Sequence, residues 1–239
     1  MPTNRQNLYV RGSSETAASL SKVSKVVDGK HIVNSVDFNV RYGETALISG
    51  PSGSGKSTCL RMLADLEYPT TGEVMVFGQL MNDLSPSQKE RLIARRVSVA
   101  TQDPALLKNR SVWSNFTSIS EAIGFSGNKR QIAERAGYLV LKLGLTDLID
   151  RRAGTLSGGE QCKVAIGRAL VKKPDLLILD EPTHMVDPKG TSEVFERLSD
   201  MQSREGFSIA IVSHDLDQVL PFVDTHTIID SGYTLSSTV

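Results

Sequence analysis

Residues 45–58 read TALISGPSGSGKST, and this stretch decides the fold class. The apolar run at residues 45–48 predicts a buried strand, because it is short and ends in a glycine-rich loop. Leu60, Leu63 and Leu66 have helical spacing and predict a helix over residues 56–66. A strand, a glycine-rich loop and a helix in this order indicate an α/β fold.

The loop matches the pattern G-x-x-x-x-G-K-[ST] at every position. Its glycines allow backbone N–H groups to turn inward around phosphate oxygens, and the following helix points its positive end at the same anion. A loop that only turns a corner is the alternative, but the strand before it and the helix after it favour a nucleoside triphosphate. We expect the phosphates to contact Gly50, Pro51, Ser52, Gly53, Ser54, Gly55, Lys56, Ser57 and Thr58. Lys56 would reach the β- and γ-phosphates, and the Ser57 hydroxyl would bind Mg²⁺.

Strands and helices alternate along the rest of the chain, which indicates an α/β core. Alternating apolar residues near 36–40 predict a strand, and residues 1–18 are polar enough to predict a poorly ordered leader. Residues 103–155 contain helices and no convincing strand, so we expect a helical insert there. Further strands are expected at residues 74–77, 97–100, 176–179, 207–212 and 227–230, and further helices at 85–95, 133–143, 158–171 and 190–204.

The composition is that of an ordinary globular protein. The chain has 239 residues, of which 39% are apolar, and 27 Lys and Arg residues balance 27 Asp and Glu residues. The zero net charge argues against binding through a bulk basic field, so we expect no nucleic-acid partner. Cys59 and Cys162 form no metal-binding pattern, and no apolar run approaches the roughly 20 residues of a membrane span.

Two acidic residues end the apolar run at residues 176–179. Asp180 and Glu181 follow it directly, at the edge of the sheet where ligands bind in open α/β folds. Asp180 suits a magnesium site, where it binds the ion either directly or through another of its ligands, and Glu181 suits a general base that orients the attacking water. A strand that ends in solvated acids is the alternative, and the phosphate loop upstream favours the functional interpretation.

The segment Leu156-Ser157-Gly158-Gly159-Glu160-Gln161 precedes a helix and forms a second anion-binding helix N-terminus. It resembles the signature motif of the nucleotide-binding subunits of ATP-binding cassette (ABC) transporters. The resemblance covers roughly residues 20–235. It implies a phosphate-loop NTPase (RecA-like) mixed-sheet core with an antiparallel β region. The ATPase domain would span residues 19–239, with a helical subdomain inserted at about 103–170.

The resemblance also implies a dimer and assigns the remaining residues. Two copies, or two paralogous cassettes, would sandwich two ATP molecules head to tail. Ser157, Gly158, Gly159 and Glu160 of one subunit would then approach the phosphates held by Lys56 of the other. Gln102 is expected to reach Mg²⁺ and the attacking water, His214 to contact the γ-phosphate, and Asp187 to cross the interface. Glu181, His214, Gln102 and Lys56 would be catalytic, and Ser57, Gln102 and Asp180 would hold the metal.

Two departures of the sequence from the family pattern bear on the nucleotide site. Most cassettes stack adenine on an aromatic residue about 29 positions before the loop lysine, where this chain has Val27. Base stacking on an aromatic ring contributes about 1–3 kcal/mol, so Val27 would either weaken ATP binding or relax base selectivity, unless another residue covers the base. His184 and Met185 also stand where the family has small residues. Neither departure removes a catalytic group, and we expect an active ATPase.

The resemblance predicts that the chain powers transmembrane permease subunits on separate chains, at the cytoplasmic face of a membrane. Residues 82–96 and VSVATQDPALL weakly resemble the cassettes of lipoprotein release, cell division and macrolide export. The alternative is an ABC ATPase that acts in a nucleic-acid, ribosome or assembly complex. A GTPase is disfavoured, because NKRQ at residues 128–131 lacks the aspartate of N-K-x-D.

Overall fold

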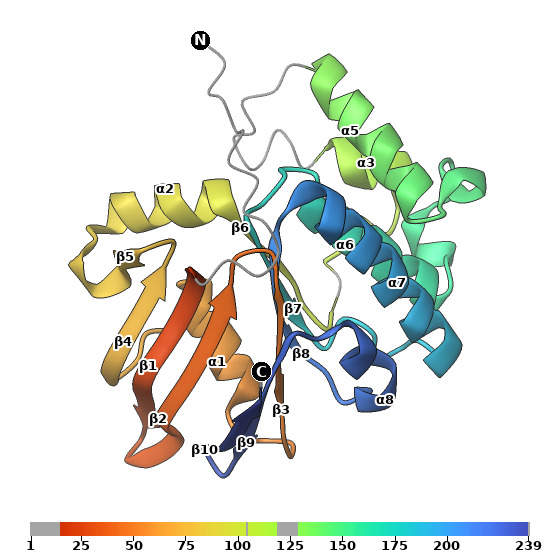
Figure 1. The fold of residues 1–239 in the computed structure, drawn as a ribbon. Coiled ribbons are helices and arrows are strands. Elements are labelled where there is room, and N and C mark those ends of the chain that lie inside the picture. Colours follow the sequence, from red (N-terminus) through yellow and green to blue (C-terminus); the bar gives the residue numbers. More distant parts are fainter. Residues whose placement is uncertain (1–14, 104, 119–128, 239) are drawn as a thin grey trace.

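The computed structural model describes residues 15–103, 105–118 and 129–238. Two sheets make up its core (Figure 1). One is a four-stranded sheet in the order β2-β1-β4-β5, and the other is a six-stranded sheet in the order β10-β9-β3-β8-β7-β6.

The four-stranded sheet is antiparallel throughout. Asp28 and Gly29 both have positive φ, 51° and 75°, so β1 and β2 join through the tight turn that the twist of a hairpin favours. The strands are β1 (Thr16–Val27), β2 (Lys30–Arg41), β4 (Thr71–Val76) and β5 (Gln79–Leu80).

The six-stranded sheet is mixed. Five strands run parallel, and the last strand returns antiparallel at one edge. The carboxyl ends of the parallel strands therefore meet at one edge of the sheet. The strands are β3 (Thr45–Ser49), β6 (Val97–Ala100), β7 (Leu176–Asp180), β8 (Ser208–Val212), β9 (Thr225–Asp230) and β10 (Tyr233–Thr238).

Helices cover both faces of this sheet, and successive apolar side chains of a strand point to opposite faces. Ile48, Ile178 and Val212 pack with α1 and the antiparallel sheet, whereas Leu47 and Leu179 pack with the helices on the other side (Figure 1). Burial on both faces explains why these strands are apolar at nearly every position. The described α-helices are α1 (Lys56–Leu63), α2 (Pro86–Arg96), α3 (Val112–Thr117), α5 (Lys129–Lys142), α6 (Gly158–Leu170), α7 (Pro188–Glu205) and α8 (Leu216–Val219). Short 3₁₀ turns occupy Met81–Asp83, Thr146–Leu148, Ala153–Thr155 and Leu220–Phe222.

Most predicted elements are confirmed, and two predictions were wrong in detail. β1 begins at Thr16, so residues 16–18, which we had assigned to the leader, belong to a strand whose Ala17 and Ala18 are buried. The helix after the phosphate loop ends at Leu63 rather than at residue 66, because Asp65 has a left-handed φ of 57°. We also missed β10, whose Ser- and Thr-rich sequence has no alternating pattern of burial.

Residues 1–14 of the expected leader lie outside the described residues. The helical insert at about 103–170 stays a prediction, because residues 104 and 119–128 are also outside them. Within the described part of the chain, no helix is both long and apolar enough to cross a membrane.

Candidate active site

The phosphate loop joins β3 to α1 at the carboxyl edge of the six-stranded sheet. Gly50 has a φ of 146°, and a Cβ there would lie 1.8 Å from the carbonyl oxygen of Ile229 in β9. Gly53 has a φ of 78° and faces open space. Gly50 thus lets the loop pass close to β9, and Gly53 supplies a left-handed turn that other residues adopt only at a cost.

Lys56 is buried at the centre of this loop, with only 5% of its surface exposed. Its Nζ donates hydrogen bonds to the carbonyl oxygens of Gly50 (2.9 Å) and Pro51 (2.7 Å). Burial lowers the pKa of its ammonium group, while the carboxylates of Glu181 and Asp180 act in the opposite direction. Among the described residues, the buried hydroxyl of Ser54 in the same loop has no hydrogen-bond partner. A confined cation and an unpaired hydroxyl in a loop of this shape fit a phosphate group.

Ser57 and Asp180 bring a hydroxyl and a carboxylate together. Ser57 Oγ donates to Asp180 Oδ1 at 2.8 Å. Both are oxygen ligands, the type that Mg²⁺ prefers, and a protein usually completes its shell with water and substrate phosphates. Within the described ranges no group of three or more His, Cys, Asp or Glu residues could hold a metal ion. With its two oxygen ligands, the Ser57–Asp180 pair fits a magnesium ion that is shared with a bound phosphate.

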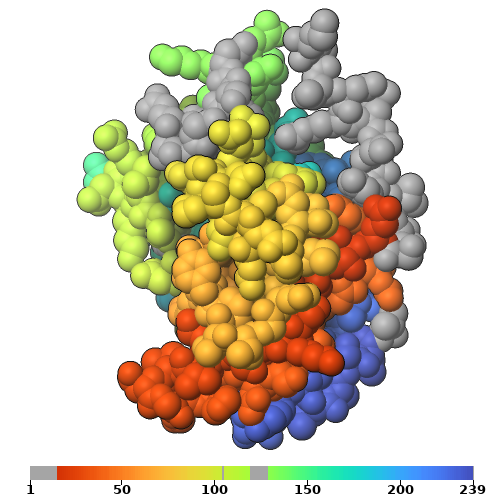
Figure 2. Space-filling model, turned by 90° about the vertical axis from the view of Figure 1, so that its left-hand side faces the viewer, coloured from red at the N-terminus to blue at the C-terminus, as the bar shows by residue number. Residues whose placement is uncertain are grey.

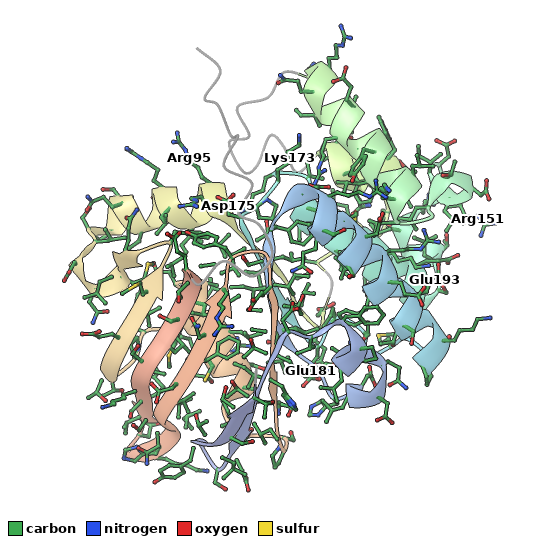
Figure 3. The ribbon with its side chains drawn as sticks, in the orientation of Figure 1. Arg95, Arg151, Lys173, Asp175, Glu181 and Glu193 are labelled. Carbon is green, nitrogen blue, oxygen red and sulfur yellow. The ribbon has the colours of Figure 1, made fainter. Side chains whose placement is uncertain are left out.

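Glu181 and His214 form the second pair at this edge. Glu181 Oε1 lies 2.7 Å from His214 Nε2, and the backbone N–H of Glu181 donates to the carbonyl oxygen of Val212 at 2.9 Å. Glu181 has a φ of 50°, a conformation that costs roughly 1–3 kcal/mol outside glycine and that recurs at functional sites. Figure 3 labels Glu181 at one end of β7 and Asp175, which precedes the strand, at the other. The carboxylate is thus placed on the same side of the sheet as the phosphate loop.

A buried threonine ties the two loops that carry this pair. Thr183 Oγ1 donates to Asp215 Oδ2 at 3.1 Å, and Thr183 is only 1% exposed. The backbone N–H of Asp215 donates to Ser213 Oγ at 3.1 Å. Neither Thr183 nor Asp215 is predicted from the sequence, because nothing in their spacing shows that they bond. The only signals were that Thr183 lies two residues after Glu181 and that Asp215 directly follows His214.

The signature segment caps α6. Ser157 Oγ accepts from the N–H of Glu160 (3.3 Å), and the Glu160 carboxylate accepts from the N–H of Ser157 (2.8 Å). Gly158 has no room for a side chain, because a Cβ there would lie 2.4 Å from the carbonyl oxygen of Met185. Asp187 in turn caps α7 by accepting from the N–H of Gly190 at 2.9 Å. The signature and residues 185–187 therefore form one exposed surface feature.

The structure brings Lys56, Ser57, Asp180, Glu181 and His214 together at the carboxyl edge of the sheet. Gln102 lies two residues beyond the end of β6 at the same edge and is exposed. Cys59 is buried in α1 and packs as a small apolar residue.

A family model described as ABC transporter matches residues 33–184. The chain belongs to this family. The resemblance inferred from the signature segment is thus confirmed, and with it the expectation of an ATP-binding ABC subunit.

Relatives of this ABC protein include ATP-binding proteins of import systems and of a lipoprotein-releasing system. The lipoprotein-releasing system ATP-binding protein LolD 1 of Rhodospirillum rubrum is 38% identical over 207 residues, 85% of this chain and 91% of LolD 1. The spermidine/putrescine import ATP-binding protein PotA 1 of Pseudomonas aeruginosa is 34% identical over 222 residues, 90% of this chain. The match spans only 58% of PotA 1. The subfamily preference stays a prediction, because both kinds of relative match at similar identity.

Solved ABC cassettes share the fold. The dimeric structure of the ABC transporter cassette MJ0796 has a TM-score of 0.82 at 25% identity and covers 92% of this chain and 97% of that one. The same cassette was solved in a post-hydrolysis state with ADP and phosphate. The predicted phosphate-loop NTPase core is thereby confirmed.

Proposed function

We propose that this chain binds and hydrolyses ATP as the motor subunit of an ABC transporter and acts as a head-to-tail dimer. One observation carries the proposal. The loop lysine, the Ser57–Asp180 pair and the Glu181–His214 pair converge on one edge of the sheet. Its domain comprises the two sheets and a helical subdomain at about residues 103–170.

The triphosphate is held by the loop. Backbone N–H groups of Gly50 and of residues 52–58, together with the ammonium of Lys56, bind its oxygens and offset their charge, and the start of α1 adds a positive helix end. Ser57, Asp180 and Gln102 hold Mg²⁺, which supplies charge neutralisation when it is bound. The ammonium exchanges its bonds to the carbonyl oxygens of Gly50 and Pro51 for phosphate oxygens.

Glu181 acts as the general base. Its carboxylate accepts a proton from the attacking water, a role worth typically 10²–10⁴-fold in rate. His214, 2.7 Å away, fixes the direction of that carboxylate and contacts the γ-phosphate. The close pair keeps one carboxylate oxygen engaged and leaves the other free to accept the proton.

A second copy, or a paralogous cassette, completes the site. Ser157, Gly158, Gly159 and Glu160 present a helix N-terminus that is exposed or partly exposed, and Asp187 lies on the same surface feature. Such a helix end binds anions, and the phosphates in the partner's loop are the anion that a head-to-tail dimer supplies. The dimeric structure of the cassette MJ0796 supports the pairing of two such chains.

The membrane partners are permease subunits on separate chains, and the protein works at the cytoplasmic face of the membrane. The import and release systems named for its relatives support this placement. Isolation of the protein from detergent-solubilised membranes tests it. A co-purifying hydrophobic subunit is expected, whereas a ribosomal or nucleic-acid complex in its place would contradict the transport role.

Calorimetry of ATP binding tests the site itself. Lys56→Ala removes the only cation buried in the loop and should abolish binding at micromolar ATP. Lys89→Ala, a lysine on α2 that pairs with Asp65, is the matched control and should leave affinity unchanged. Unchanged affinity in Lys56→Ala would contradict the assignment of the loop.

A further inference from the structure

An exposed tyrosine stands beside the phosphate loop. We propose that Tyr233, the first residue of β10, is the platform on which the adenine base of bound ATP stacks. The inference rests on the proposed function, since it needs the triphosphate to lie in the loop of residues 50–57. The loop fixes the phosphates, so the base must lie within one nucleotide length of it.

The loop and the β9–β10 turn flank one carbonyl group. A Cβ at Gly55 would lie 2.6 Å from the carbonyl oxygen of Ile32 in β2, and a Cβ at Gly232 would lie 3.1 Å from the same oxygen. The N–H of Asn34 donates to the carbonyl oxygen of Gly232 at 2.7 Å. Figure 2 shows the C-terminal strands in blue against the N-terminal strands in red. The residue after Gly232 therefore starts its strand next to the loop.

The ring of Tyr233 is held in place with much of its surface open. The amide Nδ2 of Asn34 donates to its hydroxyl group, while 52% of the residue remains exposed. A ring fixed at its tip loses little conformational freedom when a ligand covers its face. Asn34 thus presents the ring rather than burying it.

Neighbouring residues of β1 and β2 provide an apolar surface on the face of the hairpin that carries Asn34. Alternate residues of a strand share a face, so Ile32 lies on the same face of β2 as Asn34. Val27 pairs with Lys30 across the hairpin and shares that face as well. Val27 is 45% exposed and aliphatic, and therefore provides no π surface. Tyr233 supplies an aromatic ring beside this aliphatic surface.

Tyr68 is the other large exposed aromatic residue in the described part of the chain, at 57% exposure. It lies beyond the far end of α1, and the Lys89 ammonium stands 4.8 Å from its ring centre. Its surroundings already supply a cation, and α1 separates it from the loop. Tyr68 therefore serves as the matched control for Tyr233.

Competition binding distinguishes the contribution of the base to affinity from that of the phosphates. ATP and inorganic tripolyphosphate each displace a fluorescent ATP analogue from the purified chain. Tyr233→Ala should lower the affinity for ATP by at least about fivefold, which is the lower end of the contribution of base stacking. It should change the affinity for tripolyphosphate by less than about twofold. Tyr233→Phe, which keeps the ring, should retain ATP affinity within about threefold. Tyr68→Ala should match the parent for both ligands.

ATP affinity in Tyr233→Ala within twofold of the parent would overturn the proposal, and so would an equal loss for both ligands. If the alanine variant does not fold, Tyr233→Leu, which keeps the bulk without the π face, must show the same selective loss. Lys56→Ala distinguishes the two levels of inference. Lys56→Ala should abolish binding of both ligands. If it does so while Tyr233→Ala binds ATP as the parent does, only the role of Tyr233 is refuted.

Discussion

Replacing Thr183 by valine removes one hydrogen bond between the two loops that carry Glu181 and His214. Valine keeps the shape of the buried side chain but loses the hydroxyl that donates to Asp215 at 3.1 Å. Hydrogen bonds to charged groups contribute about 1.5–3 kcal/mol, and Asp215 is partly exposed, so we expect about 1.5 kcal/mol. In a chain of this length that corresponds to a fall in Tm of about 3–6 °C.

The same loss should appear in catalysis. If the bond holds His214 against Glu181 in the transition state, about 1.4 kcal/mol corresponds to a tenfold fall in kcat. The KM for ATP should change less than about twofold, because Lys56 and its loop are untouched. Steady-state phosphate release and thermal unfolding measure the two effects, and Thr183→Ser, which keeps the hydroxyl, is the control. A Tm that falls by several degrees while kcat stays within twofold of the parent would refute the positioning role.

Three further predictions concern other parts of the chain. Ser157→Arg places a bulky side chain on the exposed signature segment and should abolish ATP-dependent dimerisation on a sizing column. Ser157→Asn keeps a helix cap and should still dimerise. A normal dimer of the arginine variant would contradict the contact between the signature segment and the partner's phosphates. Burial lowers the pKa of His226, whose ring nitrogen Nε2 lies 2.7 Å from Ser49 Oγ. The unfolded chain therefore takes up the proton first as pH falls below about 6.5, which destabilises the native protein, and the Tm of His226→Gln should fall less than that of the parent between pH 7 and pH 5. Equal falls in Tm would contradict a role of His226 in acid destabilisation. Burial raises the pKa of Cys59 and Cys162 to about 12, so neither thiol of the native protein should react with a disulfide reagent at pH 8 until denaturant is added.

Local sequence was sufficient to predict the elements that are buried on both faces or that carry a motif. The strand at residues 97–100 and the start of α6 were predicted at their observed positions, because an apolar run and a Ser-Gly-Gly start are local signals. Asp180 and Glu181 were placed at the correct edge of the sheet, because parallel strands share the direction of their carboxyl ends.

Contacts between distant segments were not predictable in this way. The Thr183–Asp215 bond joins residues that meet only because β7 and β8 are neighbours. β10 pairs with β9 through its backbone, so its Ser and Thr side chains give no periodic signal. Without β10, the proximity of Tyr233 to the phosphate loop could not be inferred. The physical cause in each case is pairing between strands, which one-dimensional patterns do not encode.

Single-turnover hydrolysis of ATP by the Glu181→Gln variant tests the central claim most directly. Glutamine keeps the size of the side chain and removes the proton acceptor that faces the edge shared with Lys56. We predict a rate at least about 100-fold below that of the parent, ATP affinity within about twofold, and accumulation of an ATP-bound dimer. Hydrolysis at a rate near that of the parent would show that Glu181 is not the base and would contradict the account.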